Sequence, residues 1–96
     1  MYILRFPDSF KPTYNIIVKE DKKKEKRIKK ALNLLRQDPF YPSLKSHKIN
    51  TRSFGVRWSS WITGDLRIIW DFDSEEKLRI ILFALVTHTG AHREYK

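Results

Sequence analysis

The spacing of the apolar residues changes once along the chain, and this change most constrains the fold. From Ser9 to about Gln37, apolar residues recur every three or four positions, as they do on one face of an α-helix. From Phe54 to Val86 they alternate with polar residues or run continuously, as they do in β-strands. This order predicts an α+β fold, and 96 residues allow a single domain over residues 1–96.

Two helices are expected in the first half. Phe10, Tyr14 and Ile17 share one face of a helix that begins at Ser9, whose hydroxyl can cap it. A second helix is expected over residues 21–37, where the opposite face is rich in lysine. Its apolar stripe consists of Ile28, Ala31, Leu32 and Leu35. Because such stripes need a partner, we expect the helical hairpin to cover one face of the sheet and to leave the other partly open.

Four strands are expected, at residues 2–6, 54–62, 66–72 and 78–86. Thr63 and Gly64 supply a tight turn between the second and third of these strands. Residues 38–53 show no clear period and are expected to form a long connection, a kind of segment that is often functional. The predicted order is β-α-α-β-β-β.

The composition narrows the classes of partner. Twenty lysines and arginines against eleven acidic residues give a formal net charge of +9, which favours nucleic acid, an anionic membrane surface or an acidic protein as partner. The chain has no cysteine, which fits a reducing compartment. Its start, MYILRFPDSF, is too short an apolar run for a signal peptide or a transmembrane span. A cytoplasmic protein that does not enter a membrane is therefore expected.

Two groups of side chains suit RNA chemistry. In the connection, His47 lies between Lys45 and Lys48, where it could act as a neutral base or simply belong to a basic loop. On the strands, a guanidinium beside an aromatic ring suits a phosphate and a stacked base. The residues concerned are Arg57, Ser59 and Trp61, joined by Arg67 if the turn sets the assumed register. The alternative is an ordinary salt bridge to Asp65 or Asp71.

The end of the chain, THTGAHREYK, holds the other two histidines, His88 and His92. Gly90 lies between them, no cysteine accompanies them and no HExxH pattern occurs, so we expect no metal site. His92 follows a glycine turn and could reach the rim of the sheet as an acid–base group, unless it belongs to a solvated tail. His88 continues the last strand and is expected to have a structural role.

Several stretches together resemble the RelE/ParE superfamily of bacterial toxins from toxin–antitoxin pairs. They are the helical hairpin, DPFYPSLKSHKI, TGDLRIIWDF and the terminal TGAH. The resemblance implies helices packed on a curved, mostly antiparallel sheet. It also implies an endoribonuclease that cuts mRNA on the ribosome without a metal or other cofactor, and an antitoxin that neutralises it.

The resemblance assigns roles to individual residues. TGAH is similar to the YafQ branch, in which the histidine at the position of His92 is catalytic and a second functional histidine matches His47. Asp65 matches an aspartate of that branch, and Arg67 resembles the strand arginine that stabilises the scissile phosphate in RelE. Arg57 lies near a lysine of RelE. The chain departs from the family's pattern at Ser59 and Trp61, where the YafQ branch has an aspartate and a histidine, and at Tyr95, which lies closer to the histidine than the family's late aromatic residue.

The expected function is that of a ribosome-dependent mRNA endoribonuclease whose substrate supplies its own 2′-OH nucleophile. His92 or His47 would transfer the proton, and Arg67 would stabilise the phosphate with help from Lys45 and Lys48. Trp61 or Tyr95 would stack a base. Two alternatives stay open: a ParE-like inhibitor of DNA gyrase without catalysis, and a basic RNA-binding module.

Overall fold

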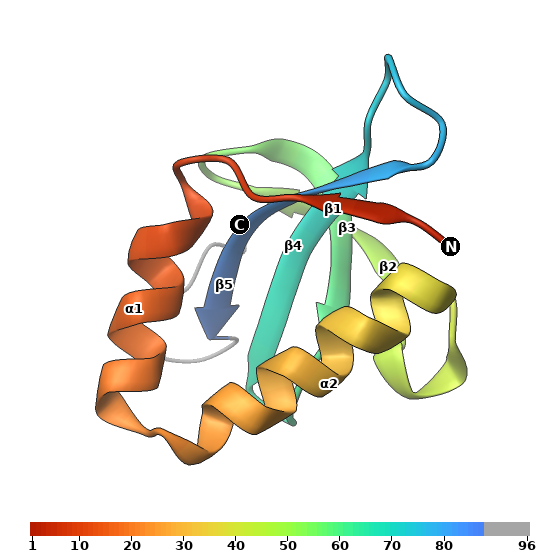
Figure 1. Cartoon of the computed structure of the whole chain (residues 1–96). Coiled ribbons are helices and arrows are strands. Elements are labelled where there is room, and N and C mark those ends of the chain that lie inside the picture. The colour runs from red at the N-terminus through yellow and green to blue at the C-terminus, as the bar shows by residue number, and fades with distance from the viewer. Residues whose placement is uncertain (88–96) are drawn as a thin grey trace.

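The computed structural model describes residues 1–87 and contains two α-helices, one 3-10 turn and five strands (Figure 1). In chain order they are β1 (Ile3–Arg5), α1 (Phe10–Glu20), α2 (Lys23–Gln37), η1 (Pro42–Leu44), β2 (His47–Thr51), β3 (Gly55–Trp61), β4 (Leu66–Phe72) and β5 (Arg79–Thr87). None of the helices in this part of the chain is long and apolar enough to cross a membrane.

The five strands form one sheet in the order β1-β5-β4-β3-β2. β1 runs parallel to β5, and all the other neighbouring pairs are antiparallel. Both helices lie on the same side of this sheet (Figure 1). The predicted α+β class, with a helix pair on a mostly antiparallel sheet, is therefore confirmed.

The core lies between the helices and the sheet. Ile28 and Leu35 of α2 are fully buried against Ile68 and Trp70 of β4, so the predicted apolar stripe is confirmed. Trp70 stacks on Trp58, its direct partner on β3, with ring centroids 5.8 Å apart. Removing a fully buried aromatic side chain of this kind costs about 3–5 kcal/mol of stability.

Ser9 does not cap α1, which corrects the sequence-based expectation. Its backbone is already helical (φ −69°, ψ −23°), whereas a capping residue needs an extended conformation. The Ser9 hydroxyl instead donates to the carbonyl oxygen of Phe83, 2.7 Å away on β5. One turn later the backbone N–H of Leu85 donates to the hydroxyl of Thr13 at 3.0 Å. These bonds connect the start of α1 to β5.

The two helices are tied to each other by Tyr14 and Glu25. The Tyr14 hydroxyl donates to the Glu25 carboxylate at 2.5 Å. This bond, with smaller effects from burial and from the negative charge of Glu25, raises the pKa of Tyr14 to about 12. The pair is partly exposed, so it adjusts the stability of the hairpin and does not determine the fold.

The connection over residues 38–53 is more regular than the sequence indicates, because it contains η1 and the edge strand β2. β2 pairs with β3 along its whole length, from His47 opposite Ser59 to Thr51 opposite Gly55. An edge strand is bonded on one side only and can be polar on both faces, so β2 lacks the apolar alternation that identifies a strand. The structure thus adds one strand to the predicted order.

The sheet face that points away from the helices is partly open, as expected, but its centre is buried. A small apolar cluster made by Ile69, Ala84 and Val86 is buried at its centre. Ile49, Phe54 and Phe83 pack around this cluster and are partly exposed.

Candidate functional site

Strand register brings the candidate residues of the far sheet face together. Trp61 lies directly opposite Arg67 on β4, which confirms that the two share a face. Ser59, two positions before Trp61, lies opposite His47 at the start of β2. Because side chains alternate along a strand, His47 points to the same face as Trp61 and Arg67.

Two cations contact the indole of Trp61. The Nζ atom of Lys45 lies 4.1 Å from the ring centre, and the guanidinium carbon of Arg67 lies at the same distance. Both distances are within the range of cation–π attraction. We refer to Lys45, His47, Trp61 and Arg67 as the Trp61 site. Its members come from β2, β3, β4 and the residue that follows η1.

Arg67 is the most restrained member of the Trp61 site, with 5% of its surface exposed. Its Nη1 atom donates to the carbonyl oxygen of Thr63 at 2.6 Å, and this neutral partner leaves the positive charge in place. The Thr63 hydroxyl accepts the backbone N–H groups of Asp65 and Leu66, which fixes the turn that carries the carbonyl. A phosphate that reaches Trp61 would therefore meet a positioned, largely desolvated cation.

A chain of hydrogen bonds holds the segment that contains Lys45 and His47. The indole N–H of Trp70 donates to the Ser60 hydroxyl at 2.7 Å, and the Ser46 hydroxyl donates to the carbonyl oxygen of Pro39 at 2.6 Å. Each hydroxyl has one hydrogen, so Ser60 must donate the 2.6 Å bond between Ser60 and Ser46. The three bonds thus run in one direction, from the fully buried Trp70 through Ser60 and Ser46 to the carbonyl oxygen of Pro39.

Nothing in the spacing of the residues singles out Ser46 or Ser60. Their only signal is polarity at positions where an apolar residue is expected, since Ser60 lies on the helix side of β3 and is fully buried. From the sequence, Thr63 is likewise expected only to form part of a turn. All three residues act through the backbone or through other side chains, which periodicity cannot reveal.

Arg57 is held by three contacts on the far face, away from Trp61. Its Nε donates to the carbonyl oxygen of Phe54 at 2.9 Å, and its Nη1 pairs with the Asp71 carboxylate at 3.1 Å. Its guanidinium carbon also lies 4.5 Å from the ring centre of Phe83. The salt bridge to Asp71 was the alternative drawn from the sequence. These contacts suit a structural role better than the predicted role in RNA binding.

The structure places Lys48 apart from the Trp61 site. Lys48 points to the helix side of the sheet, where its Nζ lies 5.3 Å from the ring centre of Trp58. Asp65 is exposed in the turn before β4. His88, His92 and Tyr95 lie outside the described residues. Within residues 1–87, no group of three or more histidine, cysteine, aspartate or glutamate side chains is arranged to hold a metal ion.

No protein-family model and no curated protein matches the sequence. Among solved structures, a YoeB/ParE toxin from Agrobacterium tumefaciens aligns with a TM-score of 0.68 and 18% identity, covering 93% of this chain and 100% of the toxin. A copper-bound mutant toxin from Helicobacter pylori gives 0.67 and 18%, with 92% and 96% covered. YafQ from E. coli strain BL21(DE3) gives 0.67 and 13%, with 91% and 93% covered. The chain therefore has the fold of these toxins.

Proposed function

We propose that the chain is the toxin of a toxin–antitoxin pair and that it cleaves mRNA on the ribosome without a metal ion. The fold supports a toxin role, because three toxins share it over more than nine tenths of the chain. The Trp61 site is the observation that best supports nuclease activity. There a nearly buried Arg67 lies against Trp61, on the same sheet face as His47.

The proposed reaction uses the 2′-OH of the substrate as nucleophile. A base removes the 2′-OH proton, an O2′–P bond forms, and the bond from phosphorus to the 5′-oxygen of the next nucleotide breaks. An acid returns one proton to that oxygen, so the products are a 2′,3′-cyclic phosphate and a free 5′-OH. Negative charge grows on the phosphate oxygens in the transition state, where a fixed guanidinium stabilises it most. Arg67 takes this role.

The two cations on Trp61 differ in how easily their side chains can move away from the indole, and this difference suggests how RNA enters the site. Lys45 is exposed, so a base can displace its ammonium group from the indole and stack there. The displaced lysine is then free to pair with a phosphate of the same strand. Arg67 is held by Thr63 and cannot leave in this way. The site therefore combines a movable cation for binding with a fixed cation for catalysis.

His47 is suited to the role of base. Its Nδ1 lies 2.9 Å from the carbonyl oxygen of Lys45. Because a carbonyl only accepts, Nδ1 carries the hydrogen of the neutral ring, and Nε2 is left as the proton acceptor. In this scheme His92 remains the second acid–base residue and protonates the leaving 5′-oxygen. Both roles are proposals that rest on the chemistry of imidazole and on the family resemblance.

Cleavage and gyrase inhibition can be separated in one experiment. The protein is added to a translation extract, the 5′ ends of a reporter mRNA are mapped, and supercoiling by purified gyrase is measured in parallel. We expect new 5′-OH ends within the translated region and unchanged supercoiling. Loss of supercoiling with intact mRNA would instead establish the ParE-like alternative. Intact mRNA with normal supercoiling would leave only an RNA-binding role.

A further inference from the structure

A second aromatic surface lies on the helix side of the sheet, just after the end of α2. Phe40 packs edge-to-face on Trp58, with ring centroids 5.0 Å apart. Its ring centre also lies 6.3 Å from that of the fully buried Trp70 and 6.2 Å from that of Phe72, so Phe40 packs on the helix-side core. Yet Phe40 is 51% exposed, which leaves much of its ring in contact with water.

Lys48 adds a cation to this aromatic surface. Its Nζ lies 5.3 Å from the ring centre of Trp58, within the range of cation–π attraction, and its side chain is exposed. The nearest carboxylate along the chain, that of Asp38, accepts the backbone N–H of Phe40 at 3.0 Å. We refer to Phe40, Lys48 and Trp58 as the Phe40 surface.

The Phe40 surface repeats the lysine–tryptophan pair of the Trp61 site on the opposite face of the sheet. Lys45 lies over Trp61 as Lys48 lies over Trp58. The two lysines are three positions apart in the chain, and so are the two tryptophans. Because side chains alternate between the faces of a strand, this odd spacing puts the pairs on opposite faces, about 10 Å apart along the strands. Both pairs lie at the end of the sheet where β2 is the edge strand.

We propose that the Phe40 surface is a second stacking site for single-stranded RNA. A base would stack on the exposed ring of Phe40, and Lys48 would pair with a phosphate beside it. A strand held at Trp61 can continue round the β2 edge to this surface, since a small single-strand-binding domain covers roughly 4–16 nucleotides. The inference rests on the proposed function in that RNA is the ligand, but it does not require cleavage.

The charge and the repeated pair favour RNA as the occupant. An RNA strand alternates flat aromatic bases with phosphates, so it matches a ring beside a lysine at each of the two places. A second copy of the chain would bring its own formal net charge of +9, which disfavours self-association. Since every base has a π face, stacking on Phe40 would add affinity without reading the sequence.

The test measures binding of a fluorescent single-stranded RNA of about 12 nucleotides to the 96-residue chain. Every ribose carries a 2′-O-methyl group, so the strand cannot be cleaved by attack of its own 2′-OH. Phe40→Leu keeps an apolar side chain on the core but removes the aromatic face, and it should weaken binding at least about fivefold. Phe40→Tyr keeps the ring and should bind as the parent does.

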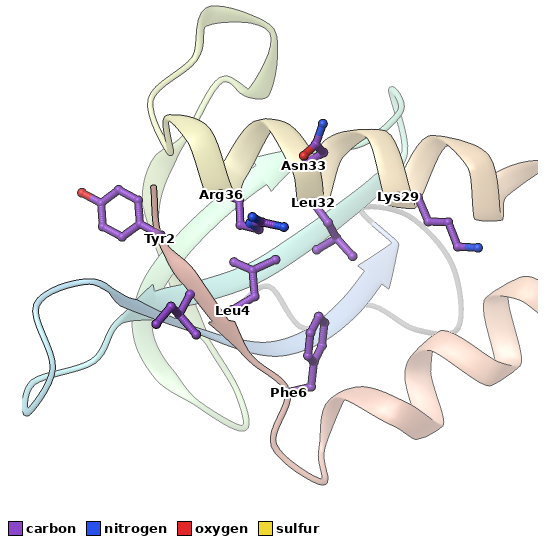
Figure 2. Close-up of a pocket in the computed structure, with 8 residues that line it drawn as sticks. Tyr2, Leu4, Phe6, Lys29, Leu32, Asn33 and Arg36 are labelled. Carbon is purple, nitrogen blue, oxygen red and sulfur yellow. The ribbon is translucent and has the colours of Figure 1, made fainter.

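Phe6→Leu is the matched control. Phe6 is 50% exposed and packs edge-to-face on Phe10, also with ring centroids 5.0 Å apart. It lines a different hollow, between β1 and α2, which Figure 2 shows. The same substitution there should leave RNA binding unchanged. If Phe40→Leu and Phe6→Leu bind RNA alike while both keep the parent's circular dichroism, the proposal is wrong.

A pair of lysine variants tests the cation of the Phe40 surface. Lys48→Ala should reduce the slope of the logarithm of the binding constant against the logarithm of salt concentration by about 0.7. Lys29→Ala removes the same charge from α2, but Lys29 already pairs with Glu25 at 4.0 Å, so the slope should change less. Equal reductions for the two variants would contradict the place of Lys48 beside a stacked base.

The outcome separates this proposal from the nuclease. A chain whose RNA binding depends on Phe40 but which leaves mRNA intact in the translation extract supports the Phe40 surface and contradicts the proposed nuclease. A chain that cleaves mRNA but binds RNA equally as Phe40→Leu and as Phe6→Leu contradicts the Phe40 surface alone. A dimer in light scattering that Phe40→Leu dissociates would identify a second copy as the occupant and would also overturn the proposal.

Discussion

The Trp61 site and the Phe40 surface use the same pair of strands in opposite ways. The Trp61 site gathers charged groups on paired strands, where backbone hydrogen bonds and the Trp70–Ser60–Ser46 chain fix each position. The Phe40 surface places a half-exposed ring beside an exposed lysine, and Phe40 itself lies outside the strands. The first suits a reaction that needs precise placement, and the second suits the stacking of any base.

The difference also separates two uses of positive charge. At Trp61, a cation with 5% of its surface exposed is held against an aromatic ring, so its electrostatic effect on a phosphate bound there would be strong and local. At the Phe40 surface, Lys48 is exposed, so it attracts a phosphate at a distance and is screened by salt. Changes at the two surfaces should therefore affect different measurements.

The largest expected effect is on cleavage. His47→Ala and His92→Ala should each lower the rate about 10²–10⁴-fold, because each removes a proton-transfer group. His88→Ala is the control, and we expect it to lower stability more than cleavage. The 5′-end assay in a translation extract measures the rates, and circular dichroism checks folding. A folded His47→Ala protein that cleaves at the parental rate would remove His47 from the mechanism.

Ser46→Ala tests whether the hydrogen-bond chain positions the Trp61 site. The change leaves the buried Ser60 hydroxyl without its acceptor and should cost about 1–3 kcal/mol in the free energy of unfolding. Cleavage should fall roughly tenfold in kcat with little change in KM, because Lys45 and His47 lose their anchor. Asn50→Ala on the same edge strand is the control. Equal kcat values for Ser46→Ala and the control would show that the hydrogen bonds through Ser46 have a purely structural role.

A smaller effect is expected in the salt dependence of RNA binding. The logarithm of the binding constant should fall with the logarithm of salt concentration by about 0.7 for each phosphate neutralised on a single strand. Lys45→Ala should reduce this slope by about 0.7. Arg57→Ala should leave it unchanged, since Asp71 already holds that guanidinium. A reduced slope for Arg57→Ala would restore Arg57 as a phosphate contact.

The smallest effect concerns the hairpin formed by α1 and α2. The pKa of Tyr14 is raised to about 12, so the folded state keeps this proton more tightly than the unfolded state does. The resulting stability is present below pH 10 and is lost as pH rises toward 12. Tyr14→Phe should abolish that loss and should cost below about 1 kcal/mol at neutral pH, because the pair is partly exposed. Identical pH profiles for the two proteins would contradict the assignment.

The helix pair and the strands that follow it could be predicted from the sequence, because the apolar residues that face the core recur at the spacing of a helix or a strand. Trp61 and Arg67 were placed on one face because strand alternation and a short turn leave few registers. Edge strand β2 and the hydroxyl chain through Ser46 could not be predicted, since neither depends on apolar spacing. The partial exposure of Leu32 could not be predicted for a related reason: Leu32 belongs to the apolar stripe that faces the core, and only the packing shows that it is partly exposed.

The central claim is that Arg67 performs chemistry at one surface while Phe40 binds RNA at the other. We would measure mRNA cleavage and binding of the 2′-O-methyl RNA for both Arg67→Ala and Phe40→Leu under the same conditions. The account predicts that Arg67→Ala cleaves about 10²–10³-fold more slowly, a far larger loss than its loss of RNA affinity, and that Phe40→Leu loses no more in cleavage than in affinity. Arg67→Ala protein that is folded and cleaves at the parental rate would contradict it.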